Sequence, residues 1–416
     1  MTFHPTRIVA ALGLAFALAA QAAPDARLKA AAEAAQPAVI ESLKQMVAIE
    51  TGSLDVAGLS KLADLTEGRL KALGFATERR KATRGAGADI VVGTLKGAGG
   101  RNIMLMAHMD TVYTPGILAS QPFKQDGNRL YGPGIADDKG GIAVILHSLA
   151  ILREQGWKDF GTLTVVFNPD EEVGSIGSGE LIADLGSRQD YVLSYEPNPA
   201  KDVYKTEGLL LAAAGASTAY LEVKGRASHA GAAPELGRNA LIELSHQILQ
   251  TRDVAKGIPG AQLNWTTSTG GTARNQIPDK SVAVGDVRIT QPGAEAKLLA
   301  ALQEKVASSR LVPDTETTVR VETGRPAYVA GEAGLALAKR AQAIYAELDN
   351  RPLQLIPGSG GATDAGYAGA SGKAAVMESF GLAGFGYHAR DEYIELDSIV
   401  PRLYLTTRML VELGRR

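Results

Sequence analysis

The first half of the chain alternates short, unbroken apolar runs with segments of helical periodicity. The runs at 103–107 and 162–167 carry no charged residue, which is typical of strands buried on both faces of a sheet. Strands are expected at 89–95, 103–107, 162–167 and 191–195, and helices at 38–50, 59–73 and 139–155. This alternation predicts an α/β fold with a mixed, mostly parallel sheet.

The pattern changes between 216 and 323. Here the expected order is a strand at 217–224, a helix at 235–251, strands at 262–268 and 281–289, a helix at 295–308 and a strand at 315–322. The order βαββαβ is that of a compact ferredoxin-like unit. Helical periodicity resumes at 333–348 and 397–413, so the unit is expected to be an insertion, 216–323, into a larger domain made of 23–215 and 324–416.

The first 22 residues have the pattern of a secretory signal peptide. His4 and Arg7 precede an apolar run at 8–20, and the segment 20–22 reads Ala-Gln-Ala, a typical cleavage site. The run is short for a membrane span, which needs about 20 residues. We therefore expect cleavage near Ala22 and a periplasmic or secreted protein without a membrane anchor.

Composition narrows the chemistry. The 416 residues have a formal net charge of −2, which gives no electrostatic reason to expect nucleic acid or an anionic membrane as partner. The sequence has no cysteine, so any metal must be held by His, Asp and Glu. That ligand set suits zinc in a hydrolytic site rather than in a structural one.

Acidic and imidazole groups follow the expected strands or lie in Gly-rich loops: His108 with Asp110, Asp137 with Asp138, Glu171 with Glu172, Glu196, and His388. Carboxylates gathered at one edge of a sheet would repel one another without a cation between them. Two histidines and three carboxylates fit two zinc ions that share a bridging carboxylate and a water. The alternative for any single pair is solvated loop charge.

Five joined motifs resemble those of the M20 family of zinc peptidases, and the resemblance covers nearly the whole chain after the signal peptide. They are 108–113 (His-Met-Asp-Thr-Val-Tyr), 131–141 (Tyr-Gly-Pro-Gly-Ile-Ala-Asp-Asp-Lys-Gly-Gly), 167–175 (Phe-Asn-Pro-Asp-Glu-Glu-Val-Gly-Ser), 227–237 (Ala-Ser-His-Ala-Gly-Ala-Ala-Pro-Glu-Leu-Gly) and 384–388 (Gly-Phe-Gly-Tyr-His). The resemblance implies a zinc-peptidase catalytic domain with an inserted dimerisation, or lid, domain. It also implies a homodimer with two zinc ions per chain, whose substrates are small N-acyl amino acids or peptides.

The resemblance also implies roles for the metal-site residues. One zinc would be held by His108 and Glu196, the other by Glu172 and His388, with Asp137 bridging. Glu171 would be the general base, Asp110 would support His108 from behind, and the Asp137–Asp138 peptide bond would be cis.

In the inserted unit, the resemblance implies that His229 reaches the active site of the partner subunit and polarises the scissile carbonyl. Asn275 and Arg288 would hold the substrate, since a guanidinium binds a carboxylate through two hydrogen bonds. Gly360 and Gly361 would allow close approach of the backbone to the substrate. His147 and His246 lie within expected helices and are interpreted as structural.

The C-terminal residue that the enzyme would remove is left open. Family members that cleave glutamate have a Lys and a Ser facing its side chain, whereas Gly208 and Leu210 stand at those positions here. This departure favours an apolar residue, with the 209–214 run as an apolar wall. Arg325 is the remaining candidate to bind a side-chain carboxylate, which would favour glutamate.

Other functions remain open. On the same scaffold the chain could be an aminopeptidase, a dipeptidase or an aminoacylase, although Arg288 suits a substrate with a free carboxylate. A periplasmic solute-binding protein would share the export signal and the α/β domains. It would not need a base beside metal ligands, so the pair Glu171–Glu172 favours the enzyme.

Overall fold

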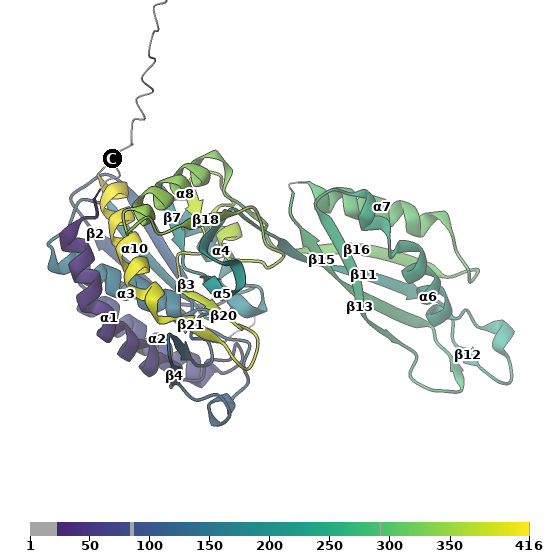
Figure 1. The fold of residues 1–416 in the computed structure, drawn as a ribbon. Coiled ribbons are helices and arrows are strands. Elements are labelled where there is room, and N and C mark those ends of the chain that lie inside the picture. The colour runs from purple at the N-terminus through teal and green to yellow at the C-terminus, as the bar shows by residue number, and fades with distance from the viewer. Residues whose placement is uncertain (1–22, 84–86, 292, 416) are drawn as a thin grey trace, which may run out of the picture.

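The computed structural model describes residues 23–83, 87–291 and 293–415. They form two lobes joined by a narrow junction (Figure 1), and both ends of the described chain lie in the larger lobe. The proposed signal peptide, 1–22, lies outside the described residues. None of the helices in the described ranges combines the length and the apolarity that crossing a bilayer requires.

A six-stranded sheet runs through the larger lobe. Its strands, in spatial order, are β1 (Ala76–Lys81), β2 (Asp89–Lys96), β6 (Thr162–Asn168), β3 (Asn102–His108), β7 (Tyr191–Ser194) and β19 (Ala375–Met377). The last four of these are mutually parallel, and β1 and β2 pair antiparallel. The mixed, mostly parallel sheet expected from the sequence is therefore confirmed.

Both faces of this sheet are buried, which explains the continuous apolar runs. Along β3, Ile103 and Leu105 join one core cluster while Met104 and Met106 join another on the opposite face, as the twofold period of a strand requires. The first cluster packs against α1 (Ala26–Val47), α2 (Val56–Ala72), α3 (Lys139–Glu154), α8 (Gly331–Ala346) and α10 (Ile399–Gly414). The second packs against α4 (Gly179–Gly186) and α9 (Ala365–Ala368).

A second sheet of short strands completes the larger lobe. Its order is β4 (Lys124–Asp126), β5 (Arg129–Tyr131), β21 (Tyr393–Glu395), β20 (Ala383–Phe385) and β8 (Asn198–Pro199). Two-stranded pairs are formed by β9 (Glu207–Leu210) with β18 (Leu353–Ile356) and by β10 (Ala212–Ala213) with β17 (Tyr328–Val329). The short helix α5 (Lys201–Tyr204) follows β8.

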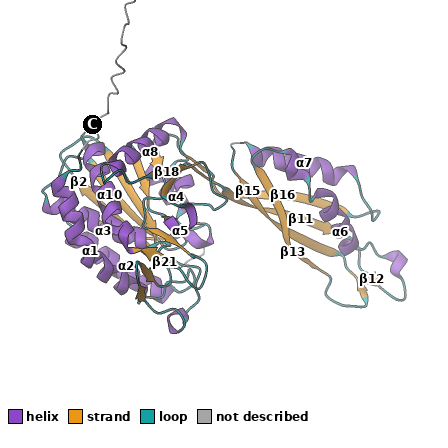
Figure 2. Ribbon diagram, in the orientation of Figure 1, coloured by secondary structure: helices purple, strands orange, loops and turns teal. Residues whose placement is uncertain are grey.

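The smaller lobe is an antiparallel sheet with two helices on one face (Figure 2). Its strands, in spatial order, are β13 (Ala261–Gly270), β15 (Lys280–Ile289), β11 (Gly215–Lys224) and β16 (Glu316–Arg325). Buried residues of β11 and β15 pack against α6 (Ala240–Thr251) and α7 (Ala294–Ser308). A small pair, β12 (Ser228–His229) with β14 (Gln276–Ile277), lies at the tip remote from the larger lobe (Figure 1).

Two helix starts differ most from those expected. Helix α1 begins at Ala26 and continues through Pro37, because Asp25 caps its N-terminus and Leu28 and Ala32 pack in the core. The helix expected at 235–251 begins only at Ala240, where Asn239 accepts two backbone N–H groups; residues 234–236 form a separate 3-10 turn.

Candidate metal centre

The strand ends bring the candidate ligands together. β3, β6 and β7 are parallel neighbours, so their carboxyl ends share one edge of the sheet. β3 ends at His108, the turn carrying Glu171 and Glu172 follows β6, and Glu196 follows β7. The remaining ligands come from loops beside α3 and β20.

Asp137 lies between the two histidines. Its Oδ1 is 2.8 Å from Nε2 of His108, and its Oδ2 is 3.4 Å from Nε2 of His388. Glu196 lies 3.8 Å from the His108 ring, and Glu172 lies 2.9 Å from the His388 ring. One carboxylate with an oxygen directed at each histidine is the arrangement that a ligand shared by two metal ions needs.

Asp110 holds this arrangement from behind. Its Oδ1 lies 3.3 Å from Nδ1 of His108, while its carboxylate accepts the backbone N–H groups of Glu171 at 3.0 Å and of Glu172 at 3.1 Å. The hydroxyl of Ser53 donates to the same carboxylate at 2.8 Å. A single buried side chain therefore orients one imidazole and the turn that carries two candidate site residues.

The peptide bond between Asp137 and Asp138 is cis, which confirms the expectation drawn from the resemblance. Asp138 itself turns away from the centre. Its carboxylate accepts the backbone N–H of Gly141 at 3.1 Å, at the start of α3, and that of His108 at 3.3 Å. It therefore connects the loop of Asp137 to the end of β3.

The electrostatics of the cluster favour a cation. Burial raises the pKa of Glu171 to about 8 and holds the pKa values of Glu172 and Glu196 above their usual range. Hydrogen bonds to Asp137 and Glu172 raise the pKa of His388 to about 10. These raised pKa values mean that the cluster holds extra protons when no metal is bound. A divalent cation can displace such protons and bind the same carboxylates and imidazoles.

Two groups of described residues have ligand atoms close enough to hold one ion each. They are His108 with Glu171 and Glu196, and Asp137 with Glu172 and His388. All five expected ligands belong to these groups, together with Glu171. The donor set of imidazole and carboxylate fits zinc.

The proposed base has a cationic neighbour. Nη1 of Arg325 donates to the Glu171 carboxylate, and Nη2 donates to the backbone oxygen of the same residue. Both side chains are buried, and Nε of Arg325 lies 3.5 Å from Oδ1 of Asp364. Arg325, considered from the sequence only as a substrate ligand, therefore contacts the centre directly.

The structure places His229 and Asn275 together but away from the centre of their own chain. Ala230 donates to the backbone oxygen of Asn275 at 2.9 Å. His229 ends β12 and Asn275 directly precedes β14, so both residues lie at the tip of the smaller lobe, where Figure 1 labels β12. Nδ1 of His229 accepts from Gly231 and Ala232 in an exposed turn. Arg288, on β15 at the end nearer the junction, pairs with Asp286 at 3.0 Å.

The other expected substrate residues lie near the junction. Gly360 has open space where a Cβ would stand, and Ala214 donates to the backbone oxygen of Gly361 at 2.9 Å. The expected apolar wall at 209–214 is wrong at Leu209, which is fully buried in the core of the larger lobe. Gly208 faces Ile356 within the β9–β18 pair.

The two histidines interpreted as structural lie outside the metal groups. His147 bonds Ser42 at 2.8 Å between α3 and α1, and burial lowers its pKa to about 4. His246, on α6, bonds Ser309 at 3.0 Å.

Sequence reasoning missed several residues that support the centre. Glu392 accepts the backbone N–H groups of Gly134, Ala136 and Asp137, and also the hydroxyl of Tyr113. Glu392 is far along the chain from the 134–137 loop that it supports, so no sequence pattern indicated this contact. The only available signal was its position four residues after His388. Asp364, which accepts from Asn168 at 2.7 Å, was visible only as part of a Gly-rich segment.

Comparison with known proteins agrees with this geometry. Residues 104–412 match the model of the peptidase family M20/M25/M40. The chain is 44% identical over 416 residues to carboxypeptidase G2 from Pseudomonas sp. (strain RS-16), covering 99% of each. It is 31% identical to acetylornithine deacetylase from Myxococcus xanthus over 68% of this chain and 76% of that one.

Solved structures show the same fold. An M20 family metallo-carboxypeptidase from Sulfolobus solfataricus superposes with a TM-score of 0.70 at 15% identity, covering 90% of this chain and 99% of the other. Aminopeptidase PepT from Bacillus cereus gives 0.72 at 21% identity, covering 91% and 98%. With the matched motifs and the paired metal groups at the strand ends, the chain belongs to the M20/M25/M40 family of peptidases.

Proposed function

We propose that the protein is a zinc-dependent exo-hydrolase that removes a C-terminal amino acid from N-acyl amino acids or peptides. The observation that carries this proposal is the carboxylate of Asp137 between His108 and His388, with Glu171 beside the same cluster. A solute-binding protein has no need of a buried carboxylate next to paired metal groups. The 44% identity to a carboxypeptidase supports the choice of reaction.

Two zinc ions would be held by His108 and Glu196 on one side, by Glu172 and His388 on the other, and by Asp137 between them. When bound, zinc supplies positive charge that acidifies water and polarises a carbonyl. Glu171 takes the proton of the attacking water and returns it to the leaving amine. Asp110 holds His108 and the 171–172 turn in fixed positions relative to each other during this transfer.

The smaller lobe is proposed to be a ferredoxin-like dimerisation domain, 216–323, within a catalytic domain of 23–215 and 324–416. Its helix α6 exposes Leu241, Ile242 and Leu249, which are 40–62% accessible, and β13 is an edge strand with one partner among the described strands. A homodimer would cover both features.

A dimer would also explain where His229 and Asn275 lie. Both are remote from the metal groups of their own chain and exposed, so the partner subunit's His229 could reach the scissile carbonyl. Arg288 would bind the α-carboxylate of the substrate, and Gly360 and Gly361 would line its path. The pattern of residues 1–22 supports export to the periplasm or the medium.

The residue removed is proposed to be glutamate, with an apolar residue as the alternative. Leu209 lies in the core and cannot form an apolar wall for the substrate. The buried guanidinium of Arg325 lies beside Glu171 and can meet a second carboxylate.

A panel of benzoyl-amino acids tests the function. Zinc-loaded protein should release free amino acid from benzoyl-glutamate, benzoyl-phenylalanine or both, while an amino acid amide with a free amino group and no carboxylate should remain intact. Release from the amide alone would identify an aminopeptidase and overturn the proposal.

A further inference from the structure

Arg325 is the last residue of β16, where the chain leaves the smaller lobe. Its guanidinium binds both the carboxylate and the backbone oxygen of Glu171. The side chains of Arg325 and Glu171 are only 5% and 9% accessible, so water cannot compete for the pair. A charge-assisted bond of this kind orders both partners strongly.

This ion pair is unfavourable for the action of Glu171 as a general base. A guanidinium bound to a carboxylate occupies one of its oxygens and fixes the orientation of the group. Glu171 must instead direct a free oxygen toward the water between the metal groups. In the structure, Arg325 binds one of the two carboxylate oxygens of Glu171.

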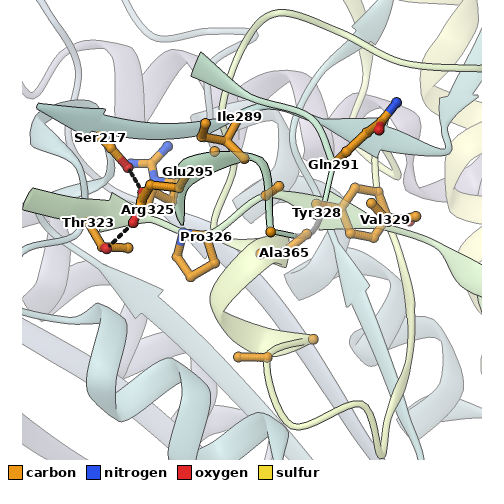
Figure 3. Close-up of a pocket in the computed structure, with 16 residues that line it drawn as sticks. Ser217, Ile289, Gln291, Glu295, Thr323, Arg325, Pro326, Tyr328, Val329 and Ala365 are labelled. Atoms are coloured by element: carbon orange, nitrogen blue, oxygen red, sulfur yellow. Dashed lines mark hydrogen bonds between the residues drawn. The ribbon is translucent and has the colours of Figure 1, made fainter. Parts of the chain in front are cut away.

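Arg325 is attached to the smaller lobe through β16. Glu295, at the start of α7, accepts the hydroxyls of Ser217 and Thr323 at 2.5 Å each and so ties β11 and β16 together two residues before Arg325 (Figure 3). The same residues line a cavity of about 420 Å³ between the lobes, whose other wall includes Tyr328 and Ala365.

We propose that Arg325 is a positioning residue that holds Glu171 in the substrate-free enzyme and releases it when the side-chain carboxylate of the substrate takes its place. The exchange replaces one guanidinium–carboxylate pair by another and leaves Asp364 beside the guanidinium, so the buried guanidinium keeps its anionic partners, while the released Glu171 carboxylate becomes free to accept a proton. The inference rests on the proposed hydrolase function. It predicts that the side-chain carboxylate of the substrate raises the rate of turnover and not only the affinity.

The test compares kcat for benzoyl-glutamate with kcat for benzoyl-glutamine, which has the same shape without the charge. In the wild type, kcat for the glutamate substrate should be roughly tenfold or more higher. In Arg325→Met that ratio should fall to about two or less, with kcat for the glutamine substrate above its wild-type value. Arg325→Lys, which keeps the charge but not the two-pronged contact, should be intermediate.

Arg288→Met is the matched control. It should raise KM for both substrates and leave their kcat ratio unchanged. A wild-type preference confined to KM, or an Arg325→Met variant that lowers both kcat values by the same factor, would overturn the inference. If Arg325→Met does not fold, the wild-type kcat ratio and Arg325→Lys decide. Wild-type protein that hydrolyses neither substrate would instead contradict the proposed function.

Discussion

The carboxylate of Glu392 accepts the backbone N–H of Asp137 at 3.0 Å, so one buried acid fixes the backbone of another. The same carboxylate accepts from Gly134 and Ala136 at 2.8 Å each. The loop that carries the shared candidate ligand is thereby closed onto the segment that follows His388. Neither acid was linked to the other by any pattern in the sequence.

Glu392→Gln should weaken metal binding. An ionised carboxylate only accepts hydrogen bonds, whereas the amide group of Gln places two donors against backbone N–H groups. We expect zinc affinity to fall by roughly 10–100-fold, as is usual when a residue that orients a ligand is changed. Competition with a chelator measures this. Tyr113→Phe, which removes one of the four donors, is the control and should have a much smaller effect; equal affinity in all three proteins would contradict the prediction.

Two zinc ions per chain should copurify with active protein. The two candidate groups lie side by side, with the carboxylate of Asp137 between their two histidines. Catalytic zinc sites keep an open position for water or substrate. Chelation should abolish hydrolysis, and zinc should restore it, with elemental analysis giving two equivalents at full activity. Full activity with a single equivalent would contradict the two-ion site.

Glu171→Gln should leave zinc binding nearly intact because the five proposed ligands remain. The amide cannot accept the proton of water, so kcat should fall by roughly 10²–10⁴. Steady-state kinetics on benzoyl-glutamate and zinc analysis of the same sample check both parts. Activity within a few-fold of wild type would mean that another group is the base.

The sequence predicted most of the elements and brought forward the candidate ligands, because apolar periodicity and short motifs are local patterns. Apolar runs in the sequence predicted the strands. In the structure, the parallel arrangement of β3, β6 and β7 brings their carboxyl ends to one edge of the sheet. What it could not predict are contacts between distant segments. Asp110 with Ser53, Glu392 with Asp137, and Arg325 with Glu171 are each separated by more than 50 residues.

Errors in the prediction have the same origin. The first helix was expected at 38–50, but packing of Leu28 and Ala32 in the core extends α1 back to Ala26, across Pro37. The 209–214 run suggested an apolar pocket, yet pairing of β9 with β18 turns Leu209 into the interior. Composition alone does not distinguish an apolar residue that meets a ligand from one that meets the core.

Glu378 should make stability depend on pH. Burial raises its pKa from 4.5 to about 7. Between these values the folded protein keeps a proton that the unfolded chain has lost, so stability falls as pH rises through this window and levels off above it. Glu378→Gln should lessen the fall from pH 5 to pH 8, by up to about 3 kcal/mol. Denaturant unfolding of wild type and variant at pH 5 and pH 8 measures the free energy of unfolding of each. An equal change in this free energy in both proteins would contradict the raised pKa of Glu378.

If the partner subunit's His229 completes each active site, two inactive variants should restore activity when mixed. His229→Ala keeps Glu171, and Glu171→Gln keeps His229, so a mixed dimer has one site with both wild-type groups. With random exchange of equal amounts, half of the dimers are mixed and each has one working site, which gives about a quarter of wild-type activity. Subunit exchange is confirmed first with differently tagged chains. As control, Glu171→Gln is mixed with a chain carrying both substitutions, which should restore nothing because no chain supplies Glu171. Absence of recovery after proven exchange would place the action of His229 within its own chain or outside the reaction.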